Sequence, residues 1–273
     1  MLGVLRLLRP MNCFLSFIAV LIGGIIALGT GAFDHLALLC LGGLVAGEFT
    51  AAGNSLNDYL DVGIDRKAHP MRPLVSGEMA PEWALNITII KFMIALFLGQ
   101  FLPPLAFVIL IVNLIIMVSY EVKLKNHGLV GNISISWLTA TLFLFAGAIV
   151  GALWPVLFIS AMAFLANLGR EIIKDVEDMD ADIGKRRTLP MAIGKNASLR
   201  AASAFLVIAI GLSILPYIFG IFHYSYLLLI LVADLGLMYT IYSASTDPRK
   251  SSSLAKMAMA MALVSFIIGG LMQ

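Results

Sequence analysis

Long apolar runs occupy almost the whole chain, and short groups of charged or turn-forming residues separate them. A helix needs about 20 mostly apolar residues to cross the hydrocarbon core of a bilayer. By this criterion the sequence predicts nine transmembrane helices, near residues 11–30, 36–58, 83–101, 104–120, 130–150, 154–174, 197–217, 222–243 and 254–271. We therefore expect an all-α, polytopic membrane protein that forms a single domain over residues 1–273.

The connections between the predicted spans differ in charge. Lys and Arg occur before the first span and after the second, fourth, sixth and eighth spans, whereas the connections near residues 31–35, 100–104, 150–155 and 217–224 contain neither. Cytoplasmic loops of membrane proteins are enriched in Lys and Arg. We therefore expect the N-terminus and all long connections to be cytoplasmic and the C-terminus to lie outside the cell membrane.

Composition agrees with a membrane protein. Apolar residues make up 60% of the chain and charged residues 12%, about half the charged share of a soluble domain. A net charge of +2 gives no indication of a nucleic-acid partner, and nothing in the sequence implies a protein partner. Membrane lipids are the expected surroundings.

An acidic motif lies at the cytoplasmic end of the second predicted span and occurs again at the end of the sixth. Asp58, Asp61 and Asp65 are spaced i, i+3, i+7, which places them within an arc of roughly 60° on one helix face. The same spacing returns 117 residues later, and a following proline and glycine return at the same offset: Asp175, Asp178 and Asp182, then Pro73 with Pro190 and Gly77 with Gly194. We interpret this pattern as an internal repeat.

The repeat predicts an arrangement of the spans. Spans 1–4 and 5–8 form the two halves, and the ninth span is added. Because the motifs are four spans apart, both run in the same direction, and the repeat is parallel about the membrane normal. The two acidic faces are then at one depth, opposite each other, near the cytoplasmic surface.

Six aspartates at one place repel one another unless cations lie between them. Oxygen-only ligands select hard cations, and Mg²⁺ binds through one or two carboxylates together with substrate phosphate oxygens. All six aspartates are therefore predicted metal ligands in a pocket for a diphosphate. Membrane topology alone also explains the nearby bases, but they are candidates for neutralising phosphate charge: Lys67, Arg72, Lys123, Lys125, Lys174, Arg186 and Arg187.

The segment NDYLDVGIDRKAHPMRPLVSG is similar to the N-D-x-x-D-x-x-x-D…R-P-x-x-x-G signature of the UbiA superfamily of intramembrane prenyltransferases, and KDVEDMDADIGKRRTLP resembles its second aspartate motif. The resemblance covers essentially the whole chain, and nine spans is the family's architecture. It implies that an isoprenyl diphosphate binds through Mg²⁺, loses pyrophosphate and alkylates an acceptor. It also implies that Asn57 and the first triad bind the diphosphate and that the second triad forms the other site, with Asp58, Asp61, Asp178 and Asp182 as catalytic residues.

Three further positions are substrate-binding candidates. Many relatives have Tyr-x-x-x-Lys after the fourth span, but here Tyr120 is followed by lysines at +3 and +5, and the choice between Lys123 and Lys125 stays open. Asn12 begins the first span, where relatives place a polar residue near the acceptor. Asn54 lies one turn before the first motif.

The chain start LRLLRPMNCFLSFIAVLIGG and the loop YEVKLKNHGLVGN resemble archaeal members of the family. Those members attach a geranylgeranyl group to the hydroxyl of geranylgeranylglyceryl phosphate. We expect Lys185, Arg186 or Arg187 to bind the acceptor phosphate and Asp182 or Glu48 to take its proton.

Two alternatives remain. One is an aromatic acceptor, as in quinone, chlorophyll or haem biosynthesis. The more remote one is a cation transporter, which the short, uncharged outer connections disfavour.

Overall fold

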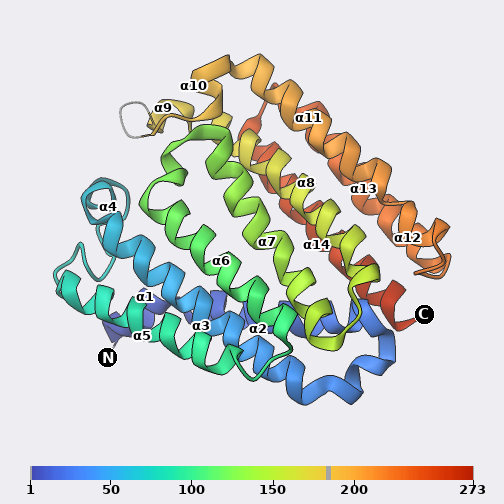
Figure 1. Ribbon diagram of the computed structural model, residues 1–273. Helices are drawn as coiled ribbons and strands as arrows, with labels where there is room; N and C mark the ends of the chain where they lie inside the picture. The colour runs from blue at the N-terminus through green and yellow to red at the C-terminus, as the bar shows by residue number, and fades with distance from the viewer. Residues whose placement is uncertain (1, 183–185, 273) are drawn as a thin grey trace.

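The computed structural model describes residues 2–182 and 186–272, and this part of the chain is helical apart from loops and one isolated β-bridge (Figure 1). The elements are α1 (Leu2–Leu8), α2 (Pro10–Leu28), η1 (Gly29–His35), α3 (Leu36–Leu60), α4 (Val62–Ala68), α5 (Pro81–Gly99), α6 (Pro104–Val122), η2 (Leu124–Asn126), α7 (Gly128–Val150), α8 (Leu153–Glu177), α9 (Met179–Asp182), α10 (Leu189–Ile193), α11 (Lys195–Leu212), α12 (Leu215–Ile218), α13 (Ser225–Ser243) and α14 (Pro248–Leu271). The predicted all-α class is confirmed.

The predicted count of nine spans is corrected to eight candidate segments in the described chain. The difference comes from Pro10–Leu60, a helical segment of 51 residues in which the 3₁₀ turn η1 joins α2 directly to α3. The first two predicted spans, 11–30 and 36–58, both lie in this segment. Its two long helices pack against each other.

The helix ends follow ordinary local chemistry. Pro10, Pro81, Pro104 and Pro248 occupy the first turns of α2, α5, α6 and α14, where the missing proline N–H is not needed. Helix α7 ends at Gly151, which is in the left-handed conformation (φ 72°) that glycine adopts freely.

Helix α7 lies at the centre of the bundle and packs against α2, α3, α6 and α8. Small residues permit this close packing: a Cβ atom on Gly23 of α2 would lie 2.5 Å from the Cβ atom of Ala146 on α7. Close helix approach through small residues is typical of membrane bundles. Figure 1 shows α4, α9 and α10 together on one side of the bundle, with η1 and α12 on the opposite side. The ends of both acidic motifs therefore lie on one side.

We predicted that each triad lies on one face of a continuous helix, and this prediction is wrong. Helix α3 ends at Leu60 and α8 ends at Glu177, 117 residues later. The next residues, Asp61 (φ −96°, ψ 8°) and Asp178 (φ −89°, ψ 1°), occupy the sparsely populated bridge region between two helices. The chain therefore turns at the middle aspartate of each motif.

Candidate active site

The aspartates of the first motif are buried, and cations hold all three. The Asp58 side chain is 2% exposed; its Oδ1 lies 2.5 Å from the Arg9 guanidinium and 3.1 Å from that of Arg72. Arg72 also pairs closely with Asp65. Basic side chains of the same chain thus lie between the carboxylates of the first motif and compensate their charge.

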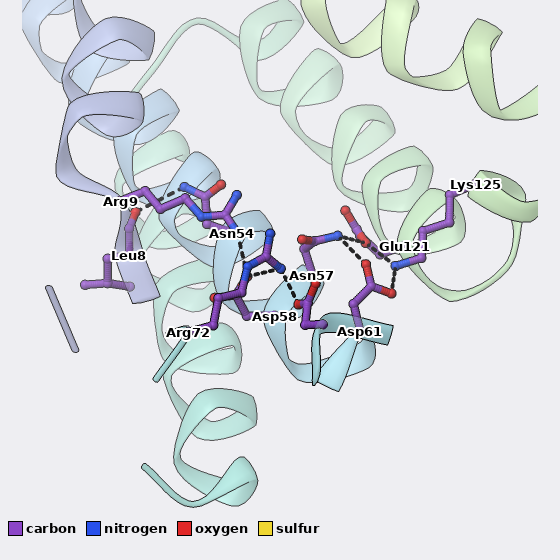
Figure 2. A network of polar contacts seen from close by, with 10 residues as sticks. Leu8, Arg9, Asn54, Asn57, Asp58, Asp61, Arg72, Glu121 and Lys125 are labelled. Carbon is purple, nitrogen blue, oxygen red and sulfur yellow. Dashed lines mark hydrogen bonds and ion pairs between the residues drawn. The ribbon is translucent and has the colours of Figure 1, made fainter. Parts of the chain in front are cut away.

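A second group of contacts surrounds Asp61. Lys125 Nζ lies 2.6 Å from Asp61 and 3.0 Å from Glu121. The Asn57 amide donates to the same two carboxylates, at 3.0 Å and 3.1 Å. Figure 2 shows the two groups side by side, one around Asp58 and one around Lys125. Together they form a buried network with opposite charges in contact, in which such hydrogen bonds are strong.

The local backbone places Lys125 in this network. After α6 the chain makes the short 3₁₀ turn η2, and α7 begins at Gly128. A Cβ atom on Gly131 would lie 2.8 Å from the Leu124 carbonyl oxygen and 3.3 Å from the Lys125 Cα, so glycine lets α7 pack against this turn. Lys123, by contrast, is exposed. Between the two lysines, Lys125 is the one at the site.

The second motif has a different environment. The Asn132 amide of α7 donates to Asp175 at 2.7 Å. Tyr120, the neighbour of Glu121 near the end of α6, is half-buried. Asp178 is half-buried.

A cavity of about 450 Å³ borders this polar network, since Arg9, Asn57 and Lys125 line it. Its polar end includes five residues that we predicted to bind substrate, namely Asn54, Asn57, Tyr120, Lys125 and Arg186. Arg9 and Glu121, which we did not predict, also line it. Its remaining wall is mainly apolar and comes from α3, α6 and α7, including Phe49, Leu110 and Phe145. The arrangement suits a ligand with a charged head and a hydrocarbon tail.

Some predicted residues lie elsewhere. Asn12, Lys123, Lys174 and Arg187 are exposed and do not line this cavity. The backbone of Arg187 instead forms the β-bridge to His127, which joins the loops before α7 and α10. The side chains of Lys67 and Asp182, and the whole of Lys185, lie outside the described residues.

Glu48 does not reach the cavity either. It pairs with Lys91 of α5 at 2.9 Å, and the middle of the α3 face that lines the cavity, at Ala46 and Asn57, lies on the opposite side of that helix. The adjacent residues Arg170 and Glu171 of α8 form an ion pair.

Sequence reasoning missed three site residues: Arg9, Glu121 and Asn132. Glu121 is 6% exposed and lies in the last turn of an apolar helix, where a charged residue is expensive and marks a functional position. Arg9 has φ 50° and ψ 69°, the only positive φ at a non-glycine residue in the described chain. Such strain costs about 1–3 kcal/mol and is typical of functional sites.

The described His, Cys, Asp and Glu residues form no group of three that is ready to hold a metal, because the first-motif carboxylates face arginine and lysine instead. Their chemistry nevertheless fits Mg²⁺: the donors are buried oxygen atoms, and hard cations prefer such ligands. Binding through these aspartates requires the internal ion pairs to open.

The model of the UbiA prenyltransferase family matches residues 16–265. The chain belongs to this family. It is 37% identical over 271 residues to the digeranylgeranylglyceryl phosphate synthase of Natronomonas pharaonis, and the match covers 98% of this chain and 97% of that protein. The chain is therefore a UbiA-family prenyltransferase, and the transporter alternative is excluded.

Solved structures agree with this membership. One that concerns digeranylgeranylglyceryl phosphate synthase superimposes with a TM-score of 0.89 at 33% identity, over 98% of each chain. A UbiA homologue from Archaeoglobus fulgidus bound to GPP and Mg²⁺ superimposes with a TM-score of 0.76 at 19% identity, over 97% of this chain and 99% of that one. The second likeness concerns the fold alone.

Proposed function

We propose that this prenyltransferase moves a geranylgeranyl group from its diphosphate to the hydroxyl of geranylgeranylglyceryl phosphate and releases pyrophosphate. The observation that carries the proposal is full-length identity of 37% to a protein with the corresponding name. A cavity with a charged end and an apolar wall supports it, since both substrates have a phosphate head and an isoprenyl tail.

The diphosphate binds at the polar end of the cavity. Asp58, Asp61 and Asp65, with Asp175, Asp178 and Asp182 of the second motif, would hold Mg²⁺, which supplies charge stabilisation for the leaving pyrophosphate. Lys125 and Arg72 pair with these aspartates, and both are placed to exchange a carboxylate partner for a phosphate oxygen. The aspartates and bases thus form one site for a metal–diphosphate.

The apolar wall protects the reaction. The C1–oxygen bond to pyrophosphate breaks, the acceptor oxygen bonds to C1, and the hydroxyl proton leaves. An alcohol is a weak nucleophile, so the reaction depends on close placement and on excluding water that would capture the cation. Phe49, Leu138 and Phe145 line the cavity and exclude water. Asp182 remains our candidate for the proton acceptor.

We further propose that the acidic ends of α3 and α8 face the cytoplasm of a cell-membrane protein. The support is the alternation of Lys and Arg between the connections. The parallel repeat is likewise a proposal, supported by the 117-residue offset between the bounds of α3 and α8.

The deciding experiment uses purified protein in detergent with labelled geranylgeranyl diphosphate and a panel of acceptors. We expect product with geranylgeranylglyceryl phosphate and none with a hydroxybenzoate or a naphthoate. Product from the aromatic acceptors alone would exclude this acceptor and leave the prenyltransferase activity intact. Replacing Arg186 and Arg187 with glutamine should raise KM for the acceptor more than KM for the diphosphate.

A further inference from the structure

A second cavity, of about 260 Å³, lies between α8, α13 and α14, with α7 and α11 completing its wall. Its described lining is hydrocarbon apart from Thr139, Ser213 and Asp234, and it contains no Lys or Arg. The Ser213 hydroxyl donates to Asp234 at 2.7 Å. The reaction described above gives this cavity no role.

The residues that line the second cavity correspond to those that line the first at the 117-residue offset of the repeat. Eight of its sixteen lining residues stand 117 positions after a residue that lines the first cavity. The eight pairs come from α3 with α8, α6 with α13, and α7 with α14. Examples are Val45 with Met162, Met117 with Asp234, and Leu142 with Met259. The second cavity therefore lies among α8, α13 and α14 as the first cavity lies among α3, α6 and α7.

The two cavities share a wall and a depth. Thr139 of α7 lines both, so they lie on two sides of the central helix. Val45 stands thirteen residues before Asp58, and Met162 stands thirteen residues before Asp175. The first cavity thus extends about 20 Å along α3 from its acidic motif, whereas the α8 lining of the second cavity, Met162 to Ala166, lies about 14 to 20 Å from Asp175.

We propose that the second cavity binds the distal part of the acceptor's own isoprenyl chain, while the first cavity holds the chain of the diphosphate. The inference rests on the proposed function, in which two lipid substrates bind at once and form a product with two chains. Their heads meet at the acidic motifs. A lining of hydrocarbon without a cation suits a chain and not a phosphate.

The first test fills the second cavity from α11. Ala209 is buried and lines the cavity, whereas Ala204 on the same helix is exposed. We expect Ala209→Phe to raise KM for geranylgeranylglyceryl phosphate about tenfold or more, with unchanged KM for geranylgeranyl diphosphate. An acceptor with a short chain should not be affected, which also shows that the variant is folded. Ala204→Phe is the matched control and should behave as the wild type with both acceptors. Equal KM values for Ala209→Phe and Ala204→Phe with the long acceptor would overturn the proposal.

The second test needs no turnover. A glyceryl phosphate ether with a diazirine at the end of its chain is photo-crosslinked to the wild-type protein, and the labelled peptides are identified by mass spectrometry. We expect label on α13 and α14, near Ala233 and Met259, and competition by unlabelled acceptor. Label confined to α6 near Met117, or label that unlabelled acceptor does not reduce, as expected if bulk lipid fills the cavity, would overturn the inference. A wild-type protein without turnover on this acceptor would instead overturn the proposed function.

Discussion

In the first acidic motif Asp58, Asp61 and Asp65 are buried against arginine and lysine side chains. In the second motif Asp175 accepts from the neutral amide of Asn132, and Asp178 is half-buried. The spacing and the helix break are the same in both motifs, so the backbone alone does not determine how the carboxylate charge is compensated. The neighbouring helices determine it: the α1–α2 connection brings Arg9 to the first motif, and the α6–α7 connection brings Lys125.

This comparison separates two kinds of acidic site. Removing a partner from a buried ion pair is strongly destabilising, because the remaining charge is left without compensation. The first motif is therefore held in shape by its own ion pairs before any ligand binds. In the second motif, Asp175 accepts from the uncharged Asn132 amide of α7.

Chelation gives the largest expected effect, because it removes the metal that both motifs are proposed to bind. Dialysis against EDTA should abolish product, and added Mg²⁺ should restore it, since oxygen-only donors bind hard cations. Turnover of labelled geranylgeranyl diphosphate is measured before and after chelation. Full activity in the chelated protein would exclude the proposed metal–diphosphate site.

Single aspartates come next. Asp61→Asn and Asp178→Asn should each reduce the turnover rate by about a thousandfold or more, because leaving-group stabilisation contributes several kcal/mol to the barrier. Asparagine keeps the size of the side chain, but at position 61 its amide accepts from only one of Asn57 and Lys125. Thermal unfolding in detergent should therefore show a loss of stability for Asp61→Asn, whose buried ion pair is broken, and little change for the half-buried Asp178→Asn.

Asp180 provides the matched control within the second motif. It is exposed and lies outside the i, i+3, i+7 spacing, so Asp180→Asn should keep the wild-type rate. Wild-type rates in Asp61→Asn and Asp178→Asn as well would show that these aspartates have no part in catalysis. A loss in one motif alone would show that the repeat has divided the chemistry unequally.

The sequence was sufficient for the helical class, the approximate ranges of the spans and the duplicated aspartates, because these depend on apolar length and spacing. It was not sufficient for the count of spans, since η1 is helical and joins α2 to α3 without a break. It also missed the turns at Asp61 and Asp178, because a spacing of i, i+3, i+7 fits a continuous helix as well as an interrupted one.

The composition of the site depended on tertiary contacts. Glu121 follows Tyr120 in an apolar run and has no sequence pattern of its own; it becomes part of the site because Asn57 of α3 and Lys125 reach the same oxygen. The choice of Lys125 over Lys123 required the η2 turn. A sequence shows which groups are available but not which cation meets which carboxylate.

Glu121 distinguishes the two halves, since its counterpart at the 117-residue offset is the exposed Met238. Glu121→Gln should weaken the placement of Lys125 and Asn57 and reduce kcat/KM for the diphosphate about 10- to 100-fold, as is typical of supporting residues. The change should appear mainly in KM for the diphosphate and little in KM for the acceptor. Met238→Leu is the control and should match the wild type. Equal loss with both substrates would point to a general structural defect.

The smallest expected effect concerns the strained arginine beside the first motif. Arg9 has φ 50°, and its counterpart in the second half, Asn126, ends the 3₁₀ turn η2. Arg9→Ala and Arg9→Gly both lose the contact with Asp58, so the difference between their free energies of unfolding reports only the backbone strain at position 9.

Because left-handed φ costs a non-glycine residue about 1–2 kcal/mol, Arg9→Gly should be more stable than Arg9→Ala by roughly 1 kcal/mol. At Asn126 the order should reverse, since glycine there only adds freedom to the unfolded chain. Denaturant unfolding in mixed micelles measures the four variants, and an Arg9→Gly variant no more stable than Arg9→Ala would show that Arg9 is not strained.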